Sequence, residues 1–66
     1  MEIVLNGSAY PLAELQTVEQ LIARLELTGK AVAVAVNRQV ISTHQWAQHI
    51  LLHEDKVDIV RAIGGG

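Results

Sequence analysis

The sequence predicts a single α+β domain in which one helix lies across a mixed β-sheet. Three features support this: a hairpin-turn dipeptide after a β-type segment, one amphipathic helical stripe, and an alternating Ala-Val run that is apolar on both faces. The chain has 66 residues, 50% of them hydrophobic, and a formal net charge of −2. This composition is typical of a folded domain, although so short a chain buries only about 60% of its unfolded surface.

The first element is expected to be a β-hairpin. Residues 3–5 form a short β-type segment. Asn6 and Gly7 follow, and both residue types readily adopt the positive φ angles that a type I′ turn requires. The returning strand, residues 8–12, contains Pro11. Because proline cannot donate a hydrogen bond to a sheet, we place this strand at an edge.

An amphipathic helix is expected to begin at Thr17. Thr17 and Gln20 have the spacing of a capping box, in which each side chain bonds the backbone N–H of the other residue. The apolar residues that follow recur with helical spacing: Val18, Leu21, Ile22 and Leu25. Gly29, with Lys30 just beyond it, is expected to end the helix in a left-handed conformation.

The Ala-Val run over residues 31–36 predicts a strand. Its three valines are β-branched, which favours a strand over a helix, and alternation would place alanine on one face and valine on the other. Residues 37–38 then predict a second tight turn, which leads into a short strand over residues 39–41.

The last third of the chain is expected to hold a short helical turn and one more strand. Ser42 or Thr43 can cap the turn, which would point Trp46 and Ile50 into the core. The last strand is predicted over residues 56–63. We place it at the centre of the sheet, parallel to the first strand, because the short and proline-containing strands suit the edges.

Composition excludes several classes of function. The chain has no cysteine, which rules out a thiolate nucleophile, a zinc–thiolate site and an iron–sulfur cluster. Five basic and seven acidic residues provide no positive field for a nucleic acid. The longest aliphatic run, residues 31–36, is far shorter than the roughly 20 residues of a transmembrane helix. The first residues lack the positive charge of a signal peptide, so we expect a cytoplasmic protein without a membrane partner.

The chain ends in three glycines, Gly64, Gly65 and Gly66, directly after the last predicted strand. A glycine end is often only a solvated tail. Here it would present the Gly66 carboxylate on a segment without side chains, which can pass through a narrow enzyme channel. We therefore divide the chain into a domain, residues 1–63, and a flexible tail, residues 64–66.

The closing segment, residues 57–66, resembles the end of ubiquitin-like β-grasp proteins. Residues 33–37 (Ala-Val-Ala-Val-Asn), followed by residues 40–41 and Trp46, are similar more narrowly to the ThiS family of sulfur carriers in thiamine biosynthesis. The resemblance covers essentially the whole chain. It implies a ubiquitin-like β-grasp fold, with four or five strands, one main helix and a short second helical turn.

The resemblance also implies a carrier rather than an enzyme. A ThiF-type adenylyltransferase, similar to ubiquitin-activating enzymes, would use ATP and magnesium to adenylate the Gly66 carboxylate. A persulfide-bearing sulfur donor enzyme would then leave a C-terminal thiocarboxylate. That group would donate sulfur to a ThiG-type thiazole synthase. Gly64, Gly65 and Gly66 would thread the partner's active site, and the chain itself would bind no cofactor and no metal.

Alternation along the last strand predicts a surface for such a partner. If its inward residues face the helix, the opposite face and the approach to the tail form a docking patch: Val4, Val60, Arg61, Ala62 and Ile63. The alternative is that these are scattered surface aliphatics beside one solvated arginine. The chain departs from the family pattern at residues 43–44 and 54–55, which affects local partner contacts rather than the fold.

Other functions are also compatible with the sequence. The chain could be the sulfur carrier subunit of molybdopterin synthase or of another sulfur pathway, a modifier that forms isopeptide bonds, or a β-grasp interaction module. His49 and His53 stand four residues apart and could share a helix face, but no third ligand has a suitable spacing, so we expect no metal site. An independent enzyme has the least support, because the sequence shows no acid–base pair or nucleophile.

Overall fold

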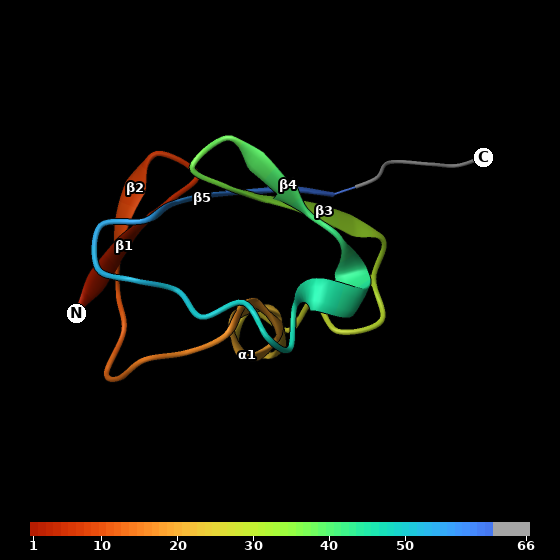
Figure 1. The fold of residues 1–66 in the computed structure, drawn as a ribbon, viewed down its shortest axis with the longest axis horizontal. Helices are drawn as coiled ribbons and strands as arrows, with labels where there is room; N and C mark the ends of the chain where they lie inside the picture. Colours follow the sequence, from red (N-terminus) through yellow and green to blue (C-terminus); the bar gives the residue numbers. More distant parts are fainter. Residues whose placement is uncertain (62–66) are drawn as a thin grey trace.

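The computed structural model describes residues 1–61 as a five-stranded mixed sheet with a helix across one face (Figure 1). The strands lie in the order β2-β1-β5-β3-β4, with β1 and β5 parallel and the other neighbours antiparallel. The predicted α+β class and the central position of the last strand are confirmed. The elements are β1 (Glu2–Leu5), β2 (Ser8–Pro11), α1 (Val18–Arg24), β3 (Val32–Val36), β4 (Gln39–Ile41), a 3₁₀ turn η1 (Thr43–Gln45) and β5 (Lys56–Arg61).

Both predicted hairpin turns are confirmed. Asn6 and Gly7 have φ angles of 49° and 83°, and Asn37 and Arg38 have φ angles of 51° and 70°. Two consecutive residues with positive φ define the type I′ turn, whose twist matches that of the flanking strands. The strand that contains Pro11 lies at one edge of the sheet, as expected. At an edge, no further strand needs a hydrogen bond from the N–H that proline lacks.

Helix α1 begins as predicted. The Gln20 N–H donates to Thr17 Oγ1 at 3.2 Å, and the Thr17 N–H donates to Gln20 Oε1 at 2.9 Å, which completes the capping box. The apolar stripe faces the sheet, because Val18, Leu21 and Ile22 are buried.

The expected end of the helix at Gly29 is wrong. The helix ends at Arg24, and Glu26 adopts the left-handed conformation with a φ of 60°. The Leu27 N–H donates to the Ile22 carbonyl at 3.0 Å, a bond typical of the Schellman motif. Leu27 packs against the core, and we attribute the early end of the helix to the burial of this side chain. Glycine would adopt the left-handed conformation of Glu26 at a lower steric cost. Gly29, with a φ of 83°, belongs to the next turn.

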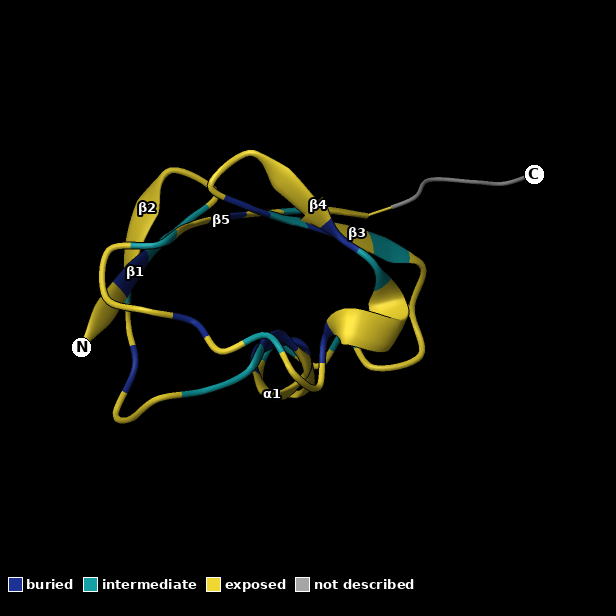
Figure 2. Ribbon diagram, viewed as in Figure 1, coloured by how far each residue is buried: buried dark blue, intermediate teal, exposed yellow. Residues whose placement is uncertain are grey.

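The alternating run forms β3 with its valines toward the helix. Val34 and Val36 are buried and Val32 packs against the core, whereas Ala33 is exposed on the other face (Figure 2). The helix therefore packs on branched side chains, and alanines cover the opposite face of this strand.

The short helical turn is η1, with Ser42 at the position before it. The Ser42 hydroxyl donates to Gln45 Oε1 at 3.0 Å and does not accept from a backbone N–H, so it is not the side-chain cap that we expected. Trp46 is buried as predicted, and its indole Nε1–H donates to the Ile41 carbonyl at 3.0 Å. A buried indole thus has its hydrogen-bond partner.

The expected inward position of Ile50 is wrong. Ile50 is 53% exposed, whereas Leu51 is fully buried. The segment is extended there rather than helical, because Thr17 and Ile50 form an antiparallel bridge and the Leu51 N–H donates to the Gln16 carbonyl at 2.8 Å. Side chains alternate along extended backbone, so the neighbour of Ile50 enters the core.

The core lies between α1 and the sheet. Its buried side chains come from the helix, from four of the strands and from the connecting segments: Ile3, Leu12, Val18, Leu21, Ile22, Val34, Val36, Ile41, Trp46, Leu51 and Val57. The helix of residues 1–61 is too short and too polar to cross a membrane.

Candidate functional site

The site predicted from the sequence begins at the end of β5. Gly64, Gly65 and Gly66 lie outside the described residues, and so do Ala62 and Ile63. The predicted boundary between domain and tail falls in the same stretch. The structure therefore describes only the segment that leads to the tail, which is the C-terminal half of β5 (Lys56–Arg61). We call this segment the base of the tail.

The two faces of β5 differ as alternation predicts. Val57 is fully buried and Ile59 packs against the core, whereas Val60 is 64% exposed. On β1, Ile3 is fully buried and Leu5 packs against the core. The last strand thus turns one face to the helix and the other to solvent, with Arg61 exposed at its end.

The docking patch is only partly brought together. Val60 lies opposite Ala33, but Val4 lies opposite Lys56, four residues earlier on β5. Four residues span about 13 Å of strand, so Val4 and Val60 do not touch the same small area. Val4 is also half-buried.

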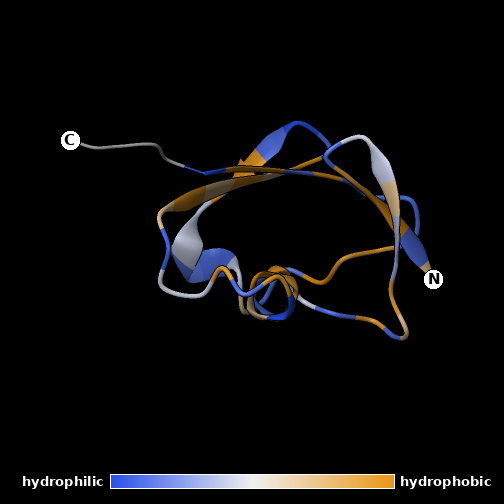
Figure 3. Ribbon diagram, turned by 180° about the vertical axis from the view of Figure 1, so that it is seen from behind, coloured by the Kyte–Doolittle hydropathy of each residue, from blue (hydrophilic) through white to orange (hydrophobic). Residues whose placement is uncertain are grey.

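The surroundings of Val60 come instead from β3 and β4. Ala35 of β3 lies opposite Asp58 of β5 and opposite Val40 of β4. Ala33, which lies opposite Val60, is two residues earlier on β3 and therefore on the same face. Val40 is 73% exposed. We call these apolar residues the outer face: Ala33, Ala35, Val40 and Val60. The hydropathy colouring shows apolar residues along β3 and β5 (Figure 3).

Sequence reasoning missed Ala33, Ala35 and Val40 as members of this surface. The signal was present in the Ala-Val alternation, because valines toward the helix leave the alanines outward. Val40 could not be placed on the same area without the register of β4 against β3.

Two asparagines hold β5 in place from opposite sides. The Ile59 N–H donates to Asn6 Oδ1 at 2.8 Å, and the Lys56 N–H donates to Asn37 Oδ1 at 3.0 Å. Asn37 also donates from Nδ2 to Asp55 Oδ1 at 3.0 Å. These side chains satisfy strand N–H groups where neighbouring strands turn away, so β5 is held at its first residue by Asn37 and near its other end by Asn6.

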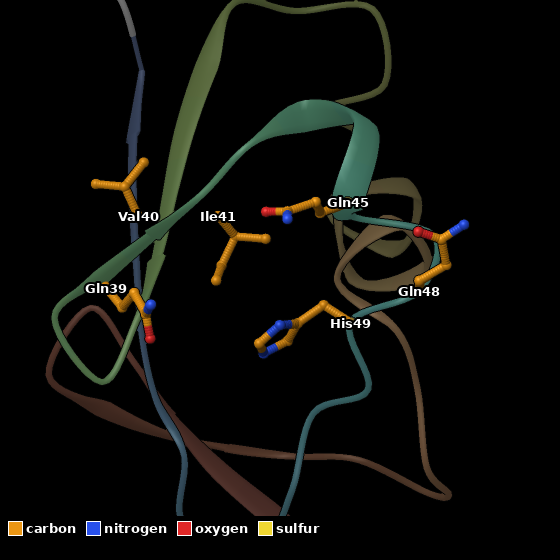
Figure 4. Close-up of a pocket in the computed structure, with 6 residues that line it drawn as sticks. All are labelled: Gln39, Val40, Ile41, Gln45, Gln48 and His49. Atoms are coloured by element: carbon orange, nitrogen blue, oxygen red, sulfur yellow. The ribbon is translucent and has the colours of Figure 1, made fainter.

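His49 and His53 are not part of the outer face, although Val40 of that face also lines the pocket of His49. His53 accepts at Nδ1 from the Glu2 N–H at 3.0 Å, whereas His49 lines a cavity of about 330 Å³ beside β4. Figure 4 shows the His49 ring and the Ile41 side chain turned into that cavity, with Val40 turned away. Its remaining lining consists of uncharged amides: Gln39, Gln45 and Gln48. Within residues 1–61, no three His, Cys, Asp or Glu side chains are grouped to hold a metal ion.

Comparison with known proteins identifies the family. The ThiS family model matches residues 3–66. This chain belongs to the ThiS family. The sulfur carrier protein ThiS of Escherichia coli is 36% identical to it over 66 residues, which is the full length of both proteins.

The fold agrees with solved ThiS structures. The crystal structure of the thiamine biosynthesis protein ThiS from Geobacter metallireducens is 25% identical and matches with a TM-score of 0.85 over the whole of both chains. A solution structure of a thiamine biosynthesis protein from the same organism has a TM-score of 0.81 at 26% identity, and the match covers 88% of that chain. The expected ubiquitin-like β-grasp fold is confirmed.

Two longer relatives contain a segment similar to the entire chain. The thiazole synthases of Paramagnetospirillum magneticum and Magnetococcus marinus are 35% and 33% identical to it over 66 residues. Those 66 residues are 20% of each synthase. In each of these relatives, a ThiS-like segment therefore forms part of a longer polypeptide named thiazole synthase.

Proposed function

We propose that this chain is the sulfur carrier of thiamine thiazole synthesis, with Gly66 as the residue that receives sulfur. The observation that carries the proposal is the ThiS family match, which extends to Gly66. The full-length similarity to the Escherichia coli sulfur carrier supports it. The segment shared with two thiazole synthases favours thiamine over molybdopterin as the pathway.

The chemistry belongs to the terminal carboxylate. One carboxylate oxygen attacks the α-phosphorus of ATP, and pyrophosphate leaves. The terminal sulfur of a persulfide then attacks the acyl carbon and displaces AMP, which gives an acyl disulfide. A thiol cleaves the S–S bond and releases the thiocarboxylate. Because this sulfur is bonded to the Gly66 carbonyl carbon, the carrier needs no thiol of its own, in agreement with its lack of cysteine.

The partners follow from these steps. A ThiF-type adenylyltransferase supplies the ATP and magnesium site, a persulfide enzyme supplies the sulfur, and a ThiG-type thiazole synthase receives it. Gly64 and Gly65 pass through the partner's channel ahead of Gly66. The exposed outer face beside the base of the tail is the docking surface, centred on Val60. We place these reactions in the cytoplasm.

The decisive test changes the position of the carboxylate. One residue added after Gly66 moves the reacting group by about 3.5 Å, and errors of ~1 Å already reduce rates about a hundredfold. We expect the extended protein, and a protein that lacks Gly66, to remain folded but to form thiocarboxylate at least a hundredfold more slowly. The measurement is intact-protein mass spectrometry after incubation with the adenylyltransferase, ATP, magnesium and a sulfur source.

The native protein should gain the mass difference between sulfur and oxygen, and fragmentation should assign it to Gly66. His49→Ala serves as a control, because His49 lies beside β4 and has no part in the proposed chemistry. Equal sulfuration of the extended protein, or a gain that maps away from Gly66, would contradict the proposal.

A second prediction concerns docking at the outer face. Val60→Asp places a charge where an apolar partner surface should lie, and Val60 is 64% exposed. We expect affinity for the adenylyltransferase to fall at least tenfold, because an unpaired charge at an interface costs more than about 1.4 kcal/mol. The free energy of unfolding should change by less than about 1 kcal/mol. Calorimetric titration and thermal melting measure the two quantities.

Leu15→Asp is the matched control for Val60→Asp. Leu15 is 62% exposed, but it lies in the segment between β2 and α1 rather than on the outer face. It should leave the affinity unchanged. If both variants weaken binding equally, the effect is a general one of charge and the outer face is not the docking surface.

A further inference from the structure

Strand β5 continues past the end of β1. The parallel pairing of these strands comprises only Val4 with Lys56 and Leu5 with Val57. The chain then turns away at residues 6–7, whereas β5 runs on to Arg61 and stays paired with β3 over that length. Among residues 1–61, no strand lies beside the last part of β5 on the β1 side.

The hydrogen-bond pattern shows which backbone groups face this open side. The Val4 N–H donates to the Asp55 carbonyl, the Asn6 N–H donates to the Val57 carbonyl, and the Ile59 N–H donates to Asn6 Oδ1. Groups of every second residue of β5 therefore point toward β1, and those between them point toward β3. Arg61 is next in this series.

The backbone groups that face the open side include the Ile59 carbonyl and the Arg61 N–H. The Ile59 N–H donates to the Asn6 side chain instead of to a neighbouring strand, and no hydrogen bond from Asn6 reaches the groups that follow it on β5. Within the described residues, neither the Ile59 carbonyl nor the Arg61 N–H has a partner on this side. Such groups form a template for an added strand.

We propose that an extended segment of the activating adenylyltransferase adds to this open side of β5 as a short strand, donating to the Ile59 carbonyl and accepting from the Arg61 N–H. The inference rests on the proposed function. Arg61 stands five residues before Gly66, and five residues reach at most about 18 Å. A main-chain clamp at Arg61 therefore limits how far the carboxylate can lie from the enzyme's strand.

Strand addition suits this task because its hydrogen bonds fix register as well as position. A shift of the added segment by one residue would turn its own paired backbone groups away from β5 and lose both bonds. The exposed Arg61 guanidinium favours an acidic residue in the added segment. A second copy of this chain is the competing occupant, and the experiments below distinguish the two.

The first experiment compares Arg61→Pro with Arg61→Ala. Proline removes the N–H that faces the open side, and the β3 pairing does not use that N–H. Alanine removes the same guanidinium but keeps the N–H. We expect Arg61→Pro to form thiocarboxylate about tenfold more slowly than Arg61→Ala, the effect of losing one interfacial hydrogen bond. Equal rates for the two variants would overturn the proposal.

The second experiment needs no variant and applies even if Arg61→Pro does not fold. Amide hydrogen exchange is measured on the native protein alone and with the adenylyltransferase. In the free protein the Arg61 amide should exchange faster than that of Val60, which faces β3. On complex formation the Arg61 amide should slow at least tenfold, whereas Val60 should change little. An unchanged Arg61 amide in a complex that other signals show to be formed would contradict the proposal.

Two further outcomes are separable. If the Arg61 amide slows as the concentration of this chain alone is raised, the occupant is a second copy and the proposal is wrong. If the native protein gains no sulfur at Gly66, the proposed function fails. If it gains sulfur there while the proline and alanine variants react equally, only the strand-addition proposal fails.

Discussion

The two hairpins, β1–β2 and β3–β4, flank the central strand β5. Their turns share the first residue type and differ in the second. Each has a two-residue type I′ turn that begins with asparagine. Each asparagine also accepts a hydrogen bond from a β5 N–H, Asn6 from Ile59 and Asn37 from Lys56. Asparagine tolerates the left-handed backbone and brings a side-chain acceptor, so one residue type both turns the chain and holds β5.

The hairpins differ in the second residue of the turn. Gly7 adopts its φ of 83° at no steric cost, whereas Arg38 has a φ of 70° with a full side chain. The second hairpin gains contacts from elsewhere in compensation. The Trp46 indole donates to the Ile41 carbonyl, and Asn37 bonds Asp55. The first turn thus holds its positive φ angles without a strained second residue, whereas the second turn carries a left-handed arginine and makes one more tertiary side-chain hydrogen bond.

The largest expected effect comes from Trp46→Phe. It removes the indole donor at 3.0 Å from the Ile41 carbonyl and leaves unfilled volume in the core. We expect the free energy of unfolding to fall by about 2 kcal/mol. Each kcal/mol lowers the melting temperature of a domain of this size by roughly 4–8 °C. Tyr10→Phe is the matched change in the first hairpin and should cost less than about 0.5 kcal/mol. Equal losses would show that the hairpins do not differ in tertiary dependence.

A smaller effect separates the two asparagines. Asn37→Gly and Asn6→Gly share the same backbone effects, because both residues have similar positive φ angles, and they differ in the side-chain hydrogen bonds that they remove: two for Asn37 and one for Asn6. At about 0.75 kcal/mol for each exposed bond, we expect losses of about 1.5 and about 0.75 kcal/mol respectively. Urea unfolding measures both. A greater loss for Asn6→Gly would reverse the comparison.

The smallest effects concern the second turn position. Arg38→Gly relieves left-handed strain, offset in part by the flexibility of glycine in the unfolded chain, and should stabilise the protein by about 0.5 kcal/mol. Gly7→Ala should destabilise it by about 1 kcal/mol. Apart from the two chain neighbours, no atom lies within 4 Å of an added Cβ at Gly7, so the cost comes from the backbone conformation. If thermal melting shows Arg38→Gly to be destabilising, the Arg38 side chain makes a contribution that exceeds its strain.

The sequence by itself determined the local elements. Both tight turns, the capping box of Thr17 with Gln20 and the separation of alanines from valines on the two faces of β3 follow from short-range sterics, hydrogen bonding and alternation. Each involves residues within a few positions of one another. The resemblance to the ThiS family, which the family match confirms, also came from short stretches of sequence.

Only the tertiary structure decided features that join distant segments. Leu27 packs on the core and ends the helix before Gly29, and the bridge of Thr17 to Ile50 turns Leu51 inward. The register of β4 brings Val40 to the outer face, and the early end of β1 leaves one side of Arg61 open within the described residues. Register and packing between segments tens of residues apart depend on how all the buried surfaces fit together, and no local pattern encodes that fit.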